Sequence, residues 1–407
     1  MIQIIEKIKQ NSTPVILFGA GDLGMLAYYA LKKRNINIKY FCDSNKKKQG
    51  KFFFDIKIIS PEELAELDKN IPIFICNSQY VEIVSSLLAK MNFNNIYDLI
   101  NLLKNTDFSN DNLDQNKFSK LSIERQIALH EQNCLKANKN VHNKFYVSNI
   151  DIVITERCSL KCKDCANLMQ YYQRPVNADH DLLFKSMDRL MSCIDKLYEF
   201  RILGGDPFMN KKMYEVVNKL VEYKNLEQVV VYTNATILPK GENFECLKNK
   251  KVRLQITNYG EMSRKHDELV KLCEENNILC VTERVKKWQD VGTIKFEQKT
   301  EKQLKNLFDN CCANNLLTFL HGKLFRCPTA AHGTNLRAIP DDPKDIVDLS
   351  NDKISLKETK DQLMNFYYNK KFITACSYCK GRDYGFGEID AAIQTKKPLV
   401  LPVLKQT

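Results

Sequence analysis

The chain has 407 residues, 44% of them hydrophobic and 27% charged, which suits two or three folded domains and argues against a disordered chain. The formal charge of +12 comes from lysines spread along the chain, so we expect a solvated basic surface or affinity for anionic small molecules, with no nucleic-acid partner. No apolar run could span a bilayer and Met1–Gln10 does not resemble a signal peptide, so we expect a cytoplasmic protein with no membrane partner. In a reducing compartment, the 15 cysteines indicate metal ligands and buried thiols rather than disulfides.

The first 103 residues have the pattern of a Rossmann-like α/β domain. An apolar strand at 15–18 runs into a G-x-G-x-x-G motif and a helix, and a second strand at 38–41 is followed by an acidic residue. A third strand is expected at 73–76. Glycines here let a phosphate approach the helix N-terminus, and the acid can accept from a ribose hydroxyl. The candidate nucleotide-binding residues are Gly19, Gly21, Gly24 and Asp43.

The rest of the chain divides into three further segments. Residues 104–145 read as a linker and a helix over 121–135, which we expect to pack on the following domain. Residues 146–305 alternate strands with amphipathic helical segments, which predicts a partial (β/α)6 barrel. Its strand-like runs begin at Ile150, Arg201, Gln228, Val252 and Ile278. Residues 306–407 form a small cysteine-rich domain with a hairpin at 317–326.

Three cysteines follow the first barrel strand. Cys158, Cys162 and Cys165 have the spacing C-x3-C-x2-C. Three thiolates can ligate three irons of a [4Fe–4S] cubane and leave the fourth iron open to another ligand. A structural zinc site is the alternative, although zinc knuckles usually combine a C-x2-C pair with a second pair of ligands.

This cysteine spacing after a strand resembles the radical S-adenosylmethionine (SAM) superfamily, over residues 150–300. The resemblance implies that SAM is cleaved reductively at the cluster, with an electron from a flavodoxin- or ferredoxin-type donor. Leu203–Pro207 resembles the GGEP motif of the family, with an Asp in place of the commoner Glu, and Asp164 takes a position that is often aromatic. The implied SAM-binding residues are Gly204, Gly205, Asp206, Thr233 and Asn234, while Thr257, Asn258, Ser263, Arg264 and His266 are weaker candidates. No residue is singled out as acting on the substrate.

A second group of cysteines lies near the C-terminus and comprises Cys311, Cys312, Cys327, Cys376 and Cys379. The group resembles the front part of the auxiliary-cluster extension of SPASM and shorter "twitch" radical SAM enzymes. That resemblance implies a second [4Fe–4S] cluster ligated by Cys327, Cys376, Cys379 and either Cys311 or Cys312, of which we favour Cys312. A zinc ribbon is the alternative. The scattered remaining cysteines are expected to be core residues.

The resemblance predicts an enzyme that oxidises, epimerises or rearranges its substrate. The N-terminal domain resembles small Rossmann-like domains attached to sugar-modifying enzymes, so the favoured substrate is a nucleotide-activated or glycan-linked sugar. That domain could bind NAD, a sugar nucleotide or nothing. Two alternatives stay open, namely modification of a ribosomally made peptide, and a zinc-stabilised nucleotide-binding protein with no enzymatic activity.

Overall fold

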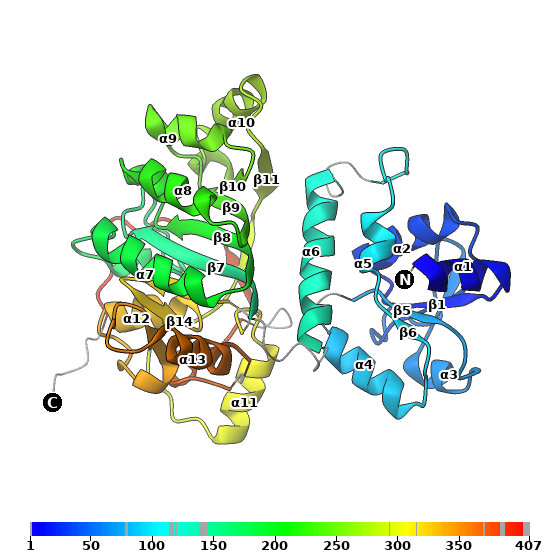
Figure 1. Ribbon diagram of the computed structural model, residues 1–407. Helices are drawn as coiled ribbons and strands as arrows, with labels where there is room; N and C mark the ends of the chain where they lie inside the picture. The colour runs from blue at the N-terminus through cyan, green and yellow to red at the C-terminus, as the bar shows by residue number, and fades with distance from the viewer. Residues whose placement is uncertain are drawn as a thin grey trace. The chain divides into compact units, whose positions relative to one another are not determined.

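The computed structural model describes residues 2–77, 80–113, 118, 120–137, 145–292, 294–314, 316–368, 371–382 and 387–401. The chain forms two compact units, Met1–Tyr146 and Val147–Thr407, coloured blue to cyan and green to red in Figure 1. Within the described residues, no helix is both long and apolar enough to cross a membrane. All 15 cysteines are free thiols. The predicted boundary at residue 305 falls inside the second unit.

The first unit is built on a six-stranded sheet that is parallel except for the pairing of its first two strands. In spatial order the strands are β3 (Phe52–Phe53), β4 (Ile56–Ile59), β2 (Ile38–Cys42), β1 (Val15–Phe18), β5 (Ile73–Ile75) and β6 (Ile96–Tyr97). The predicted strands at 15–18, 38–41 and 73–76 are therefore confirmed, each within a residue. The three strands that escaped prediction, β3, β4 and β6, have two to four residues each.

Helices cover both faces of this sheet, which explains why β1 is buried at every position. Val15 and Leu17 pack with α1 (Ile2–Gln10), α2 (Asp22–Lys32) and α5 (Ile100–Lys104), while Ile16 and Phe18 pack with α3 (Pro61–Ala65) and α4 (Val81–Lys90). Successive side chains of a strand point to opposite faces, so the four residues supply two cores. The helix α2 follows the glycine motif directly, as predicted.

The polar segment and the helix after it belong to this first unit. Three apolar residues of this polar segment, Phe108, Leu113 and Phe118, are buried in the core of the first unit. At these positions the chain is packed onto the domain and does not act as a linker. Helix α6 (Lys120–Ala137) adds Ile123 and Ile127 to the same core. We expected this helix to belong with the following domain, but it belongs to the first unit, whose core its buried isoleucines complete.

The second unit is built on an eight-stranded sheet. In spatial order its strands are β11 (Cys280–Arg284), β10 (Val252–Asn258), β9 (Leu226–Thr233), β8 (Lys196–Gly204), β7 (Tyr146–Thr155), β13 (Thr318–Leu320), β14 (Lys323–Phe325) and β15 (Ile346–Asp348). All five predicted barrel strands are present. The sixth parallel strand, β13, pairs with β7 and not with β11, so the cysteine-rich region extends the barrel sheet at its first strand.

Helices connect the parallel strands in turn, as the barrel pattern predicts (Figure 1). These helices are α7 (His180–Cys193), α8 (Met213–Glu222), α9 (Glu242–Glu245) and α10 (His266–Glu275). The C-terminal part adds α11 (Glu301–Asn310), α12 (Pro328–Asn335) and α13 (Leu356–Tyr368), together with a separate antiparallel pair, β12 (Lys287–Gln289) and β16 (Glu388–Asp390). The predicted hairpin is confirmed, and its turn residues His321 and Gly322 both have positive φ, at 49° and 77°.

Candidate functional site

The three cysteines of the predicted triad lie together in the loop after β7. Their thiols are close enough to influence one another electrostatically, and they pack against Leu160 and Ala392. Burial raises the pKa of all three thiols, that of Cys162 to about 11. A buried thiolate is costly unless a cation neutralises it, and a bound metal deprotonates a coordinating thiol outright. Iron coordination would therefore offset the cost of burying this triad.

Backbone N–H groups oppose the rise in pKa of two of these thiols. The N–H of Leu160 acts on Cys158, and the N–H groups of residues 167–169 act on Cys165. Such donors stabilise negative charge on sulfur, as at iron–sulfur sites. In the described part of the chain, no three His, Cys, Asp or Glu side chains are grouped around the position of a single metal ion. A cubane does not require that grouping, because each thiolate binds a different iron. The donor set fits a cluster.

The GGDP turn is held against the strand end that leads into the triad. The N–H of Gly205 donates to the carbonyl of Thr155, and the N–H of Asp206 donates to the carbonyl of Arg157, both at 2.8 Å. A Cβ on Gly204 would lie 2.1 Å from the Thr155 oxygen, and one on Gly205 would lie 2.0 Å from the Arg157 oxygen. We expected these glycines to make room for SAM. In the structure, the absence of their side chains allows the backbone at Thr155 and Arg157 to approach closely.

The carboxylate of Asp206 joins the ends of β8 and β9. It is fully buried and accepts from the N–H of Phe208 at 3.1 Å, and from the Thr233 hydroxyl and the Asn234 N–H at 2.9 Å. Burial raises the pKa of Asp206, and these three donors oppose that rise. The Asn234 amide in turn lies 3.6 Å from the sulfur of Cys158. The structure thus brings the predicted residues of both turns to the triad.

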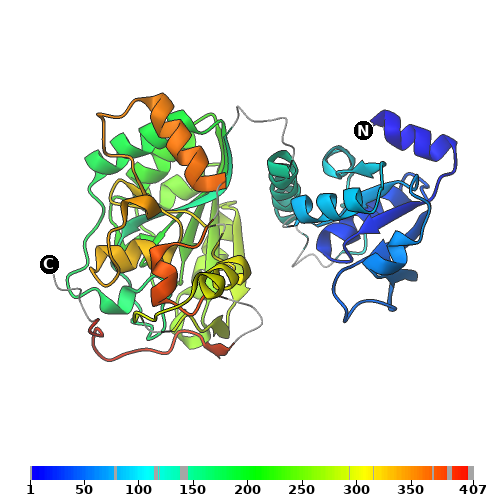
Figure 2. The same cartoon turned by 90° about the horizontal axis from the view of Figure 1, so that it is seen from below.

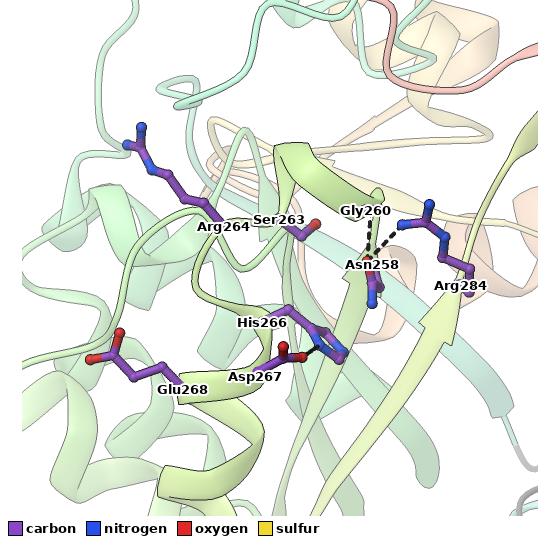
Figure 3. A pocket seen from close by; sticks show the side chains of 8 residues that line it. All are labelled: Asn258, Gly260, Ser263, Arg264, His266, Asp267, Glu268 and Arg284. Atoms are coloured by element: carbon purple, nitrogen blue, oxygen red, sulfur yellow. Dashed lines mark hydrogen bonds and ion pairs between the residues drawn. The ribbon is translucent and has the colours of Figure 1, made fainter.

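Four of the five weaker candidates, all except Thr257, line a pocket of about 550 Å³, shown in Figure 3. It lies where β10 and β11 end and α10 begins, and it is lined by Asn258, Gly260, Ser263, Arg264, His266, Asp267, Glu268 and Arg284. The Asn258 side-chain oxygen accepts from Arg284 at 3.0 Å, and His266 pairs with Asp267 at 2.7 Å. Figure 3 shows Arg264 and Glu268 pointing away from this group. The pocket offers the Arg284 guanidinium and the Asn258 amide to a ligand, and the carboxylates of Asp267 and Glu268 also belong to its lining.

Two aromatic residues that the sequence did not single out form a wall of the triad site. Tyr259 comes directly after β10, and Trp288 lies in β12. Their rings meet edge to face, with centroids 5.6 Å apart, and both pack against the triad. Burial raises the pKa of the Tyr259 hydroxyl, and the neighbouring thiols add to that rise. The position of Tyr259 directly after a predicted strand was the one feature of the sequence that could have identified it as a site residue. Trp288 is the only tryptophan in the chain, which carries no positional information.

The cysteines of the second group also lie close to one another. Cys376 interacts electrostatically with Cys379 and Cys311, and Cys327 with Cys379 and Cys376. Burial raises the pKa of Cys327 and Cys376 to about 12. Backbone N–H groups donate to two of the sulfur atoms, from Ala330 to Cys327 at 3.4 Å and from Gly381 to Cys379 at 3.1 Å. The favoured fourth ligand, Cys312, stays a prediction, and its neighbour Cys311 interacts electrostatically with Cys376 and Cys379.

In the first unit, the glycine motif packs tightly on itself. Gly19 has a φ of 122°, and a Cβ on Gly24 would lie 2.2 Å from the Gly19 carbonyl oxygen. The Asp43 carboxylate accepts from the N–H of Ala20 at 3.0 Å and from Lys48 at 3.0 Å. These contacts favour a structural role for Asp43 in holding the loop. Around Gly21, by contrast, an added Cβ would meet open space, and ligand binding here stays a prediction.

Two protein-family models match parts of the chain. One is described as "C2185-like, N-terminal" and matches residues 11–96. The other is described as "4Fe-4S single cluster domain" and matches residues 151–279, which include the triad, the GGDP turn and much of the pocket.

Similar proteins of known activity include two GTP 3′,8-cyclases. The protein from Campylobacter lari is 25% identical over 154 residues, which are 37% of this chain and 46% of that protein. The protein from Peptoclostridium acidaminophilum is 28% identical over 97 residues, which are 23% of this chain and 28% of that protein. The chain therefore spans less than half the length of these relatives.

Three solved structures illustrate the structural likeness. BtrN in complex with AdoMet and 2-DOIA is 15% identical, with a TM-score of 0.39 over 63% of this chain and 98% of BtrN. The anSMEcpe protein with bound AdoMet is 13% identical, with a TM-score of 0.39 over 63% of this chain and 93% of the other. SuiB of Streptococcus suis bound to S-adenosylmethionine is 17% identical, with a TM-score of 0.30 over 60% of this chain and 52% of SuiB.

Proposed function

This chain belongs to the radical SAM superfamily, and from that premise we propose that it cleaves SAM reductively and modifies a nucleotide-activated or glycan-linked sugar. The observation that carries the proposal is the triad of buried thiols after β7, where nearby backbone N–H groups oppose the rise in pKa of Cys158 and Cys165. Cys158, Cys162 and Cys165 would hold a [4Fe–4S] cluster there, and this cluster would supply the electron for cleavage of SAM into methionine and a 5′-deoxyadenosyl radical that takes a hydrogen atom from the substrate. We propose a flavodoxin- or ferredoxin-type protein as the electron donor.

The chain's own residues hold and shield this site. Cys158, Cys162 and Cys165 are the proposed cluster ligands. The GGDP turn fixes the position of their loop through its two backbone hydrogen bonds. Tyr259 and Trp288 pack against the triad and exclude water from it. Exclusion of water strengthens every electrostatic interaction within the site and protects a radical from side reactions.

We assign the pocket at the ends of β10 and β11 to the polar groups of SAM. Arg284 provides a cation for the methionine carboxylate, and Asn258 orients that guanidinium through a 3.0 Å hydrogen bond. His266 is anchored from both sides, by Asp267 at 2.7 Å and by the Thr282 hydroxyl at 2.6 Å, so its ring cannot turn freely. Arg284→Met should therefore weaken SAM binding, measured by equilibrium dialysis, while leaving the iron content unchanged.

We further propose that the second cysteine group binds an auxiliary [4Fe–4S] cluster. Four thiolates leave no iron open, so this cluster would pass electrons and would not anchor the substrate. The Arg382 side chain is close enough to influence Cys165 of the triad as well as Cys327 and Cys379. A cation this close to both cysteine groups would lower the cost of adding an electron to a cluster bound at either group.

The sugar-nucleotide substrate is supported by two features. The first unit has a Rossmann-like sheet and a glycine loop at the start of α2, where phosphate groups of nucleotides bind in such folds. The relatives named GTP 3′,8-cyclase act, by that name, on a nucleotide. Gly21→Val tests the first feature, because a side chain there meets open space and should block a phosphate without unfolding the loop. A variant that still binds the nucleotide as tightly as the natural chain would exclude this loop.

The decisive experiment uses the full chain reconstituted anaerobically with iron and sulfide. We expect about eight irons per chain, and release of 5′-deoxyadenosine when SAM and a strong reductant are added. Incubation with deuterated nucleotide sugars should transfer deuterium into the deoxyadenosine, whereas transfer from a peptide substrate would favour peptide modification. Cys162→Ala is the control and should abolish deoxyadenosine release. A chain that binds zinc, holds no iron and releases no deoxyadenosine would refute the proposal.

A further inference from the structure

The last described segment of the chain crosses the triad loop. We call residues 387–401 the C-terminal strap, coloured red in Figure 2, where it runs along one edge of the second unit. At one end, β16 pairs with β12. At the other end, the Leu399 N–H donates to the Gln170 carbonyl at 2.7 Å, and the Gln173 side chain donates to the Leu399 carbonyl at 2.9 Å. The strap is therefore anchored on both sides of the triad.

Between these anchors the strap is hydrogen-bonded to the backbone of the triad loop itself. The Lys163 N–H donates to the Ile393 carbonyl, and the Thr395 N–H donates to the Lys161 carbonyl, both at 2.7 Å. Ala392 is buried against the cysteines. The loop between Cys158 and Cys165 thus takes part of its support from a segment more than 200 residues further along the chain.

Gln394 makes the closest contact of the strap with a triad sulfur. Its amide oxygen accepts from the Lys161 N–H at 2.7 Å, and its amide nitrogen lies 3.2 Å from the sulfur of Cys162 and 2.7 Å from the Ala392 carbonyl oxygen. The Lys161 N–H can only donate and the Ala392 carbonyl can only accept, so both contacts require the same orientation of the amide. The N–H group therefore faces the sulfur.

We propose that Gln394 is a positioning residue for the triad, which holds the Cys162 loop with its oxygen and stabilises the sulfur with its N–H. The inference rests on the proposed cluster. Reduction adds negative charge to a cluster and its thiolates, and an N–H donor to sulfur stabilises that charge. Because the Gln394 side chain lies at the solvent edge and Cys162 is only 8% exposed, the strap also closes the ligand off from water.

The test compares three variants of the full, anaerobically reconstituted chain. Gln394→Glu keeps an oxygen for the Lys161 N–H and loses the donor to sulfur, and Gln394→Leu loses both groups without adding charge. Thr395→Val is the matched control, because its hydroxyl donates to the Lys161 carbonyl at 3.2 Å and touches no sulfur. The midpoint potential is read from the electron paramagnetic resonance signal that changes when SAM is added, which separates the triad cluster from the auxiliary one. Iron content is the second readout.

We expect both Gln394 variants to have a lower potential, with the ratio of reduced to oxidised cluster falling roughly threefold or more at a fixed applied potential. Thr395→Val should match the natural chain. Loss of iron in both Gln394 variants but not in Thr395→Val would also support the proposal. Equal potentials and iron contents in all four proteins would overturn it, as would equal losses in Thr395→Val. Failure of the natural chain to show a SAM-responsive signal would instead refute the proposed function.

Discussion

The Asp206 carboxylate accepts a 2.9 Å hydrogen bond from the Thr233 hydroxyl, and this contact ties the GGDP turn after β8 to the turn after β9. The same carboxylate also accepts from two backbone N–H groups. All three donors are satisfied by one side chain that is fully buried. Both turns border the triad, so Asp206 stabilises the surroundings of the cluster whether or not it touches SAM.

Asp206→Ala should destabilise the second unit by about 1–3 kcal/mol, because two buried donors and one partly buried donor lose their acceptor. Thr233→Val removes one of the three donors to the carboxylate and also the acceptor of the Ala235 N–H at 3.2 Å, so we expect it to cost about 1–2 kcal/mol. Urea unfolding of the cluster-free protein measures both values. If Asp206→Ala were as stable as the natural chain, the carboxylate would have no structural role, and its function would lie in SAM binding alone.

Removal of Arg201 should be more damaging than removal of any exposed cation. Its Nε donates to Asp151 at 2.6 Å, and both side chains are largely buried. Arg201→Met leaves the Asp151 carboxylate buried without its cation, at a cost of about 3–5 kcal/mol. Lys185→Met is the matched control, since the Lys185–Asp352 pair is exposed and should contribute less than about 1 kcal/mol. Unfolding free energies in urea compare the two, and equal losses would contradict the argument.

The local motifs were readable from the sequence because their residues are neighbours in the chain. Cys158, Cys162 and Cys165 occupy one loop, and a strand before them is enough to predict where that loop lies. Gln394 reaches Cys162 from 232 positions away, and a single glutamine in a polar segment carries no signal of that contact. Such contacts depend on which distant segments pair in the folded chain, and local sequence patterns do not predict that pairing.

The misassigned helix α6 illustrates the same limit. Ile123 and Ile127, four positions apart, show that one face of α6 is apolar and must pack against something. They do not show which domain supplies the partner, and here the first unit does. The position of β13 beside β7 escaped prediction for the same reason. A strand of three residues does not determine its own partner, which depends on which edge of the sheet is open for pairing.

His332 should make the stability of the second unit depend on pH. The imidazole is fully buried and bonded to the Tyr172 hydroxyl at 2.8 Å, and burial lowers its pKa to about 3. The unfolded chain therefore binds a proton at His332 that the folded chain does not, between about pH 3 and 6.5. The contribution of the neutral His332 to the free energy of unfolding is therefore complete above about pH 6.5 and decreases as the pH falls toward 3.

Replacement of this histidine should flatten that dependence. Across pH 4 to 6, His332→Gln should reduce the slope of unfolding free energy against pH by up to about 1.4 kcal/mol per unit. Tyr172→Phe should keep the slope, because the imidazole stays buried while losing one hydrogen bond. Urea unfolding at four pH values measures both slopes. An unchanged slope in His332→Gln would show that the imidazole is protonated equally in the two states.

The fourth ligand of the auxiliary cluster can be identified by iron content. Cys311 follows the last residue of α11 and interacts electrostatically with both Cys376 and Cys379. We therefore expect Cys311→Ser to lower the iron content from about eight to about four per chain, and Cys312→Ser to leave it near eight.

The two serine variants differ by one position and equally alter polarity, so each controls for the other. Retained deoxyadenosine release in Cys311→Ser would show that the triad cluster is intact and that only the auxiliary cluster is lost. The reverse pattern, with iron lost only in Cys312→Ser, would restore Cys312 as the ligand. Zinc bound at this group in the natural chain, with about four irons in total, would instead establish a zinc ribbon, because four thiolates that converge on one ion leave no room for a cubane.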